Sequence, residues 1–238
     1  MPHPQHISVV IPTLNEASTL GRTLRRLGTQ DDPFETIVVD GGSEDETRTL
    51  AQSWGAQVLQ APAGRATQMN RGAEHATGDV LLFLHADTLL PPDGLSAIRT
   101  ALDDPETASG TFRLQFDDST PFLDFYSWCT RWPWLRLCFG DRGQFARQSA
   151  FEAVGGFPEW PLFEDLELAA RLSKHGGFCF LDTAVTTSAR RFRRHGPVRQ
   201  QLLNLYLWTH YMLGTDPERV AHLYRTHASS SSEKTPLS

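Results

Sequence analysis

The stretch that decides the fold is Asp79-Val80-Leu81-Leu82-Phe83-Leu84-His85-Ala86-Asp87. Its apolar run contains no helical gap, so it predicts a β-strand that is buried on both faces. The run stops at His85 and Asp87, two residue types that bind metals. Ligands of open α/β sheets bind outside the carboxyl ends of the strands, so these residues mark a candidate reaction centre. A strand end closed by a turn-forming aspartate is the plainer interpretation of the same residues.

Composition and charge are those of an ordinary globular protein. The chain has 238 residues, 39% hydrophobic and 21% charged, which is enough for one large domain or two small ones. The formal net charge of −6 argues against broad nucleic-acid binding, because there is no general basic surplus to neutralise phosphates.

Three features favour a cytoplasmic protein. Cys129, Cys138 and Cys179 have no metal-type spacing and leave one cysteine over, which fits a reduced compartment. The first six residues lack the basic and apolar regions of a signal peptide. No apolar run approaches the roughly 18–20 residues that a membrane span needs. Such a protein can still lie against the inner face of the membrane.

Strands and helices alternate in the first 90 residues. Further strands are predicted at 7–12, 36–40 and 57–60, with helices after each. Asn15 is expected to cap the first helix, and Ser43 with Glu46 forms a capping box for the second. This alternation indicates right-handed βαβ units on a parallel sheet.

The second half is predicted to mix further elements and to end in helices. These elements are helices at 95–102, 162–174 and 198–213, strands at 109–116, 178–181 and 185–188, and a strand running into a helix over 145–151. Asp216-Pro217-Glu218 begins a last helix, and the Ser-rich residues 228–238 are predicted to be disordered.

Polar residues follow several of these strands. Thr13, Asp40, His85 and Asp87 would share one sheet edge, and Arg65 opens a helix that points back from it. A helix N-terminus with an arginine suits a phosphate. Neither a Walker loop nor G-x-G-x-x-G occurs, so an ordinary dinucleotide site is not expected. Each residue by itself is also compatible with turn or capping chemistry.

Asp165 is a candidate catalytic acid or base. Helical spacing places it on an apolar stripe with Leu168 and Leu172, whereas Glu164 is expected to face the polar side. A carboxylate on a buried stripe costs free energy unless it is paired or has a task. The alternative is a first-turn aspartate that the helix dipole stabilises by roughly 0.3–1 kcal/mol.

Taken together, these motifs resemble family 2 glycosyltransferases of the GT-A fold, over roughly residues 6–190. The residues that carry the resemblance are Ile11-Pro12-Thr13-Leu14-Asn15-Glu16, Val38-Val39-Asp40-Gly41-Gly42-Ser43-Glu44-Asp45, 65–72, the strand ending at Asp87, and Phe163-Glu164-Asp165. The chain is most similar to a bacterial subgroup with histidine in place of the first acid of the metal motif.

The resemblance implies a single GT-A domain over residues 1–226. A Rossmann-like, mostly parallel central sheet flanked by helices would carry the nucleotide sugar on residues 6–90. Residues 91–190 would form the acceptor side, and 195–226 a helical C-terminal extension.

The resemblance also implies roles on the donor side. Pro12, Thr13 and Glu16 would line the nucleotide pocket, and Asp40 would accept a hydrogen bond from the base, typically uracil. Arg65 would approach the base or the diphosphate.

On the reaction side, Asp87 would hold a divalent metal, Mn²⁺ or Mg²⁺, that bridges the phosphates of the donor. Asp165 would be the general base that deprotonates the acceptor hydroxyl. Inversion at the anomeric carbon is the usual outcome in the family.

Two departures from the family pattern affect this interpretation. Gly41 stands where a second acid often follows the second strand, which weakens the detail of base or ribose recognition. The acid-x-acid metal motif reads His85-Ala86-Asp87. Mg²⁺ can bind through one carboxylate, with phosphates and water completing its shell, and imidazole is more acceptable to Mn²⁺. His85 can instead contact the ribose or diphosphate.

An arginine cluster at residues 190–194 precedes His195. Arg191 is a candidate for neutralising the departing diphosphate, and related enzymes sometimes supply a metal-binding histidine at the place of His195. Binding of anionic lipid headgroups and a plain solvated basic loop are the alternatives.

Aromatic residues gather at 128–134 and again at 202–208. Tryptophan and tyrosine favour interfaces between apolar and wet surroundings, so these segments suit peripheral membrane contact and a lipid-linked acceptor. Packing over the sheet is the alternative.

The hypothesis is therefore a metal-dependent glycosyltransferase that moves a sugar from a nucleotide sugar, typically UDP-linked, to an acceptor hydroxyl. The acceptor can be a saccharide, a small molecule or a lipid-linked group. The alternatives are a nucleotidyltransferase and a non-catalytic nucleotide-sugar-binding protein.

Overall fold

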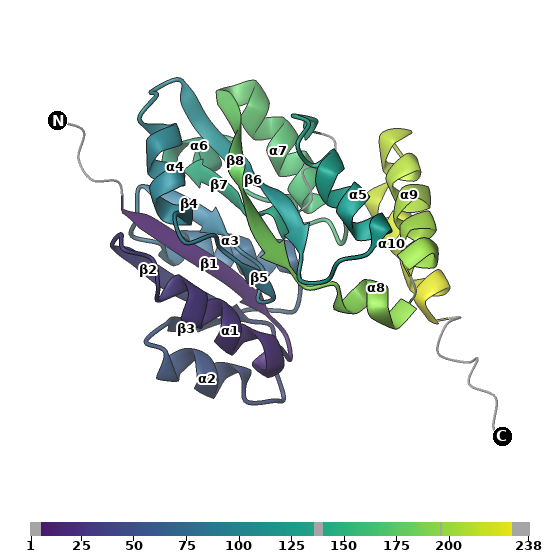
Figure 1. Ribbon diagram of the computed structural model, residues 1–238, viewed down its shortest axis with the longest axis horizontal. Helices are drawn as coiled ribbons and strands as arrows, with labels where there is room; N and C mark the ends of the chain where they lie inside the picture. Colours follow the sequence, from purple (N-terminus) through teal and green to yellow (C-terminus); the bar gives the residue numbers. More distant parts are fainter. Residues whose placement is uncertain (1–5, 136–139, 196, 230–238) are drawn as a thin grey trace.

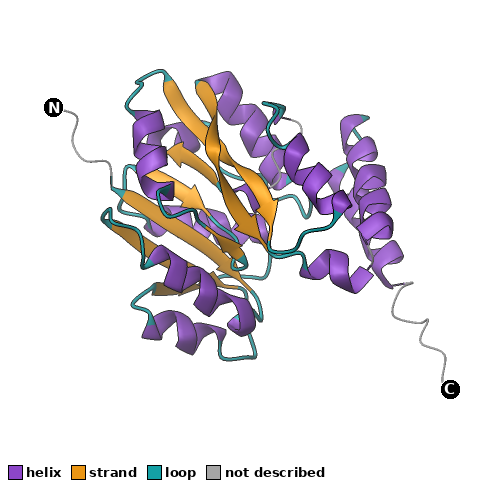
Figure 2. Ribbon diagram, viewed as in Figure 1, coloured by secondary structure: helices purple, strands orange, loops and turns teal. Residues whose placement is uncertain are grey.

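The computed structural model describes residues 6–135, 140–195 and 197–229. In this part of the chain eight strands form a sheet of order β3-β2-β1-β4-β7-β6-β8-β5 (Figures 1 and 2). The strands are β1 Ile7–Thr13, β2 Phe34–Asp40, β3 Gln57–Gln60, β4 Val80–Phe83, β5 Thr88–Leu89, β6 Thr107–Phe116, β7 Gln144–Arg147 and β8 Gly177–Thr187.

One half of the sheet is parallel and carries the predicted βαβ units. Strands β3, β2, β1 and β4 pair in parallel, with Val10 aligned to Ile37 on one side and to Phe83 on the other. Strand β7 then runs antiparallel to β4 and β6, while β8 is parallel to β6 and antiparallel to β5. The predicted α/β class with a mostly parallel central sheet is confirmed.

Helices flank the sheet and form the C-terminal part of the chain (Figure 2). Their bounds are α1 Ala17–Leu27, α2 Thr47–Ser53, α3 Arg65–His75, α4 Gly94–Leu102, α5 Pro121–Cys129, α6 Gln148–Ala153, α7 Glu164–His175, α8 Arg190–His195, α9 Pro197–Met212 and α10 Pro217–Ser229. Helices α8 to α10 are the predicted helical extension. None of the helices described combines the length and apolarity that crossing a bilayer requires.

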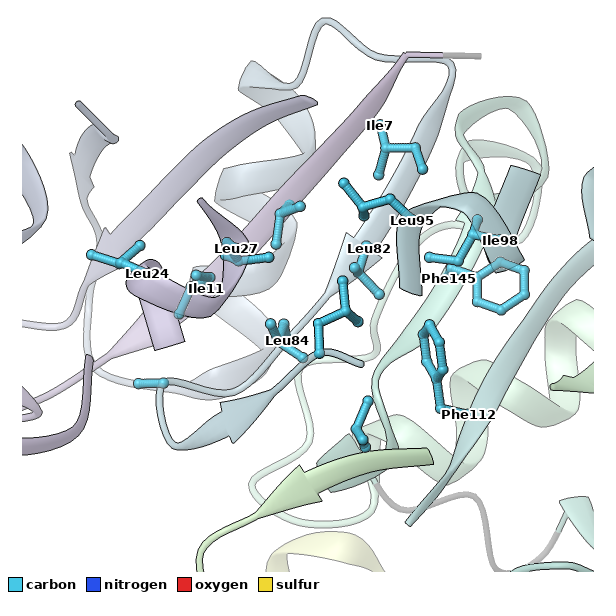
Figure 3. Packing of buried hydrophobic residues seen from close by; sticks show 14 of the residues in the cluster. Ile7, Ile11, Leu24, Leu27, Leu82, Leu84, Leu95, Ile98, Phe112 and Phe145 are labelled. Carbon is cyan, nitrogen blue, oxygen red and sulfur yellow. The ribbon is translucent and has the colours of Figure 1, made fainter. Parts of the chain in front are cut away.

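Strand β4 is buried on both faces, as its sequence predicts. Leu82 and Leu84 belong to one hydrophobic cluster, with residues of α1 and α4 (Figure 3). Leu81 and Phe83 belong to a second cluster, with residues of α3, α6 and α7. The alternation holds the strand between two helical layers and fixes the position of the residues that follow it.

The first predicted helix cap is wrong. Asn15 does not cap α1; it has φ 54°, and its Oδ1 accepts a hydrogen bond from the Glu44 backbone N–H at 2.9 Å. The N–H of Ala17, at the start of the helix, donates instead to Asp45 Oδ2 at 3.1 Å. Hydrogen bonds between the loops that follow β1 and β2 therefore take the place of an Asn15 cap on α1.

The capping box of Ser43 and Glu46 is also absent. Helix α2 begins at Thr47, and its backbone N–H donates to Asp45 Oδ1 at 3.0 Å. Ser43 is buried and donates its hydroxyl to Asp40. The serine is therefore used to close the turn after β2 rather than to start the helix.

Two further boundaries differ from the prediction. Gly177–Thr187 form one strand, β8, where two were predicted, and its pairing with β6 continues across an irregularity between Thr111 and Arg113. Helix α10 extends to Ser229, two residues into the segment predicted to be disordered. Residues 230–238 lie outside the described part of the chain.

Helix α3 approaches the sheet through Gly72, which predicts a stability effect. A Cβ at this position would lie 2.3 Å from Val10 Cγ1 and 3.1 Å from Val39 Cγ2. Gly72→Ala should lower the free energy of unfolding by about 1–3 kcal/mol, measured by chemical denaturation, because two packed layers must move apart.

Gly21→Ala in α1 is the matched control. Its Cβ would meet Leu50 Cδ2 at 3.5 Å, an ordinary contact. The substitution should leave stability unchanged or raise it by up to about 1 kcal/mol through helix propensity. Equal effects of the two substitutions would contradict the close approach of α3.

Candidate active site

The carboxyl ends of β1, β2 and β4 meet at one edge of the sheet. Thr13 is aligned with Asp40, and His85 and Asp87 follow the end of β4. Gln68 of α3 fastens two of these strands, since its Nε2 donates to the carbonyl oxygens of Thr13 at 2.8 Å and Val39 at 2.7 Å. The predicted convergence is thus present. Pro12 is buried within β1, and Thr13 is buried at its end.

Asp40 organises the turn after β2. Its buried Oδ2 accepts from the backbone N–H of Gly42 at 3.1 Å and of Ser43 at 2.9 Å, and Oδ1 accepts from the Ser43 hydroxyl. Arg48 Nε lies 3.8 Å from Oδ2. These bonds fix the carboxylate in place at the sheet edge, and its contact with a base stays a prediction.

Arg190, the first residue of α8, reaches back into the site. Its guanidinium binds Glu16 through two nitrogens, with Nη1 2.8 Å from Oε2, and its Nε lies 3.2 Å from Asp87 Oδ2. Thr19 Oγ1 donates to the same glutamate at 2.7 Å. The hydrogen bond to Glu16 raises the pKa of Arg190, burial opposes this, and Asp87 raises it further.

Sequence reasoning named a neighbour of this arginine instead. Arg191 was selected from the cluster at 190–194, but only the local helix geometry shows which member turns towards Glu16. The side chains of Arg191 and His195 lie outside what the structure describes, so their predicted roles stay predictions.

Asp141 was missed by the sequence analysis and belongs to this edge. It lies in the short 3₁₀ turn Gly140–Arg142, and its Oδ1 is 2.9 Å from His85 Nδ1. Burial raises the pKa of Asp87, and the Asp141 carboxylate raises it further, while His85 and Arg190 lower it. The carboxylates of Asp87 and Asp141, which are far apart in the sequence, therefore repel each other at this edge. The one sequence feature that could have indicated Asp141 as a site residue is an acid between two glycines, in Gly140-Asp141-Arg142-Gly143.

The donor atoms at this edge suit a divalent cation shared with a ligand. Within the described residues no group of three or more His, Cys, Asp or Glu side chains is arranged to hold a metal by itself. Mg²⁺ and Mn²⁺ accept carboxylate oxygens, and Mg²⁺ commonly binds one or two carboxylates with the remaining positions filled by phosphates and water. Asp87, with Asp141 close by, fits that arrangement. These residues do not fit a metal centre in which protein side chains supply every ligand.

A second charged cluster joins the starts of α3 and α7. Arg65 Nε lies 2.9 Å from Glu164 Oε1, and the arginine is about one-third exposed, at 34%, whereas the glutamate is buried. Burial disfavours the charged guanidinium, but Glu164, Asp165 and Asp141 together raise the pKa of Arg65. Asp141 thus acts on both clusters, which places them on one continuous edge.

The predicted orientation of Glu164 is wrong. It was expected on the polar face of its helix, yet it is almost fully buried. Phe163 precedes the helix with φ 64°, so α7 begins at Glu164 and its first side chain lies against Arg65 rather than in solvent. Its Oε2 is buried without a hydrogen-bond partner in the described residues.

Asp165 is buried, as predicted from its place on the apolar stripe. Leu168 and Leu172 on the same face are also buried. The Leu166 backbone N–H donates to Asp165 Oδ1 at 2.7 Å, and Gln144 Nε2 donates to the Asp165 carbonyl oxygen at 3.0 Å. The carboxylate is therefore held at the helix start beside the Arg65–Glu164 pair.

Comparison with known proteins identifies the family. The sequence model of the family described as Glycosyl transferase family 2 matches residues 8–157. The chain belongs to this family. The match contains Asp40, Arg65 and Asp87, and it ends before Asp165 and Arg190. It favours the glycosyltransferase hypothesis over the nucleotidyltransferase alternative, while the subgroup with His-Ala-Asp stays a prediction.

A curated relative of this family 2 chain is the undecaprenyl-phosphate 4-deoxy-4-formamido-L-arabinose transferase of Klebsiella pneumoniae subsp. pneumoniae. The two are 31% identical over 133 residues, which are 50% of this chain and 40% of the relative. The chain therefore spans about two fifths of the length of that relative.

Solved structures confirm the GT-A fold. S. aureus TarS 1-349 in complex with UDP-GlcNAc superposes with a TM-score of 0.64 at 17% identity, over 77% of this chain and 58% of TarS. The mannosyltransferase PcManGT from Pyrobaculum calidifontis, in complex with GDP-Man and Mn²⁺, gives 0.62 at 21% identity, over 98% and 82%. At these identities the likeness establishes the fold alone.

The Arg65–Glu164 pair predicts a difference between two arginines of the same helix. Arg65→Ala would leave the buried Glu164 carboxylate without its cation and should cost about 2–3 kcal/mol, less than the roughly 3–5 kcal/mol for a fully buried pair, because Arg65 is partly exposed. The free energy of unfolding in urea measures this loss.

Arg71→Ala is the control for that experiment. Arg71 pairs with Glu74 at 3.0 Å on the exposed face of α3. Its loss should change stability by no more than about 0.5 kcal/mol. Equal losses for the two variants would show that burial of Glu164 does not govern the energy of the pair.

Proposed function

We propose that the protein transfers a sugar from a nucleotide sugar, UDP-linked, to an acceptor hydroxyl with inversion, aided by Mn²⁺ or Mg²⁺. The observation that carries this proposal is the buried Asp165 carboxylate, held beside Arg65 and Glu164 at the edge that also presents Asp87. Membership of glycosyl transferase family 2 supports it. So do fold neighbours in complex with UDP-GlcNAc and with GDP-Man and Mn²⁺.

The donor would bind along the ends of β1 and β2. Pro12, Thr13 and Glu16 would form one wall of the donor site, and Asp40 lies beside Thr13 on the neighbouring strand β2. Arg65, at the first turn of α3, places positive charge and free helix N–H groups towards an anionic ligand, which suits a diphosphate.

A divalent cation would neutralise the charge of the diphosphate. Asp87 would hold it, with Asp141 as a second carboxylate and His85 oriented by Asp141. Arg190 balances the charges of Asp87 and Glu16. The same guanidinium would contact the phosphates of a donor, because arginine binds phosphate and carboxylate groups in the same bidentate geometry.

Asp165 would act as the general base. Its carboxylate takes the proton of the acceptor hydroxyl while the hydroxyl oxygen bonds to the anomeric carbon. The bond from that carbon to the phosphate oxygen breaks at the same time, and the nucleoside diphosphate leaves. A single in-line displacement of this kind inverts the anomeric centre.

For the acceptor we propose a lipid-linked group at the cytoplasmic face of a membrane. The support is the curated relative whose name specifies an undecaprenyl-phosphate transferase. Saccharide and small-molecule acceptors are the alternatives that a transfer assay distinguishes.

Asp165→Asn tests the base. The variant should bind the donor as tightly as the wild type but transfer roughly 10²–10⁴-fold more slowly, because the amide cannot take the proton. Transfer is measured with whichever nucleotide sugar most raises the melting temperature in a screen. Asp182→Asn, at a position whose side chain is 89% exposed, is the control and should keep full activity. Normal turnover by Asp165→Asn would exclude this assignment.

Asp87→Ala tests the cation site. Calorimetric titration of UDP into the wild type should show tighter binding with Mn²⁺ than without it. In Asp87→Ala this metal-dependent gain should disappear, while metal-free binding persists through the remaining contacts. Because the metal-free titration is an internal control, a gain of the same size in the variant would remove Asp87 from the metal site.

A further inference from the structure

Four aromatic side chains form a continuous exposed row on and after α5. Phe125, Trp128, Trp132 and Trp134 are 48–61% exposed, and successive ring centroids lie 5.9, 6.3 and 6.4 Å apart. We call these four residues the aromatic ladder. Rings of this size are usually buried, and a group of them on the surface marks a site of interaction.

A second apolar surface lies along α9. Leu202, Leu205 and Tyr206 share one helical face, which Leu213 extends directly after the helix, and all four are 42–78% exposed. The other face of α9 packs inward, because Trp208 and Tyr211 contact the cluster around Leu166 and Ala169. Helix α9 is thus apolar on both faces. We call the outer face the α9 stripe.

The two surfaces lie at the same end of the molecule. Leu135, next to the last ring of the ladder, packs against the same cluster as Trp208. Figure 1 places α5, α8 and α9 together at the end remote from β3. Phe192 of α8 packs its ring against Phe122 of α5 at 6.0 Å, so α8 contacts the ladder helix directly.

Positive charge accompanies these apolar side chains. Arg131 is exposed within the ladder, and Arg193 of α8 is more than half exposed, with Asp117 3.7 Å and Asp118 3.8 Å from its guanidinium. From residue 183 to 215 the sequence has five arginines and neither aspartate nor glutamate, although the whole chain carries −6. Acids lie on this side as well, since Asp124 and Asp182 line the same hollow as Trp128 and Arg131.

We infer that the aromatic ladder and the α9 stripe dock on an anionic lipid bilayer. Tryptophan rings favour the level of the headgroups, and an apolar helix face can lie in that plane. Arginines beside them would be attracted by anionic headgroups. A second copy of the chain is the alternative occupant of this face, and the experiment below distinguishes it.

The surface adjoins both sides of the active site. Helix α8 begins with Arg190, which contacts Glu16 and Asp87. Tyr211 of α9 packs its ring 5.0 Å from Phe163, the residue that precedes Glu164 and Asp165. Docking through this surface would therefore bring the site close to groups carried by lipids.

Vesicle sedimentation of the full chain without donor or acceptor tests the inference. The protein should sediment with vesicles of phosphatidylcholine and phosphatidylglycerol, and less with phosphatidylcholine alone or in high salt. The double variant Trp132→Ser, Trp134→Ser should bind roughly tenfold more weakly, because two interfacial rings are lost. Arg131→Gln should weaken binding only to the anionic vesicles.

Trp54→Ser is the matched control. Trp54 is similarly exposed, but it lies at the end of α2, outside the ladder. It should leave vesicle binding unchanged, and circular dichroism should show every variant folded. Three outcomes would overturn the inference: no binding by the wild type, equal loss in Trp54→Ser, or a dimer in light scattering that only the double variant dissolves. Since no sugar transfer is measured, none of them bears on the proposed reaction.

Discussion

The site depends on a balance of charge at one edge of the sheet. Among the described residues six carboxylates gather there, those of Glu16, Asp40, Asp87, Asp141, Glu164 and Asp165, and two arginines pair with three of them. Arg190 binds Glu16 and Asp87, and Arg65 binds Glu164. Taking a carboxylate out of water is costly unless a cation is close, so the arginines are a condition for placing these acids here.

This balance explains why a cation belongs to the proposed reaction. A nucleoside diphosphate adds negative charge to an edge where acids already predominate. If Arg190 turns towards the phosphates, Asp87 and Glu16 lose their partner, and burial together with Asp141 already raises the pKa of Asp87. A divalent cation between Asp87 and the diphosphate would satisfy both at once. The single acid of His85-Ala86-Asp87 is then sufficient, because the ligand supplies the other oxygens.

Local patterns in the sequence predicted the sheet and the edge that carry this site, but not the ion pairs between its side chains. The uninterrupted run of β4 and the strand–helix alternation gave the sheet and the edge where Asp40 and Asp87 meet. Glu164 was misplaced because the pattern of one helix contains nothing about Arg65 of α3, whose guanidinium covers the first turn of α7. Arg190 was missed because its contacts with Glu16 join residues 174 positions apart in the chain.

Hydrogen bonds in the loops were likewise not predictable from local sequence patterns. Asn15 and Ser43 are residue types that often cap helices. Here Asn15 is hydrogen-bonded to Ser43 and Glu44 in the loop after β2, and Ser43 also bonds to Asp40 in its own turn. Capping is worth only about 1 kcal/mol, so bonds between two neighbouring loops readily replace it. Such competition depends on which loops the sheet brings together, and a single local pattern contains no information about that.

Helix α8 connects the catalytic edge with the outer surface through very few residues. Arg190 contacts Asp87, Phe192 packs against α5, and Arg193 lies within 4 Å of Asp117 and Asp118. These contacts fix the helix to the sheet edge on one side and to the aromatic helix on the other. Because the helix has only six residues, it joins Asp87 and the surface around α5 over a short span. The depth at which the protein lies on a membrane would therefore set how far the reacting groups stand from it.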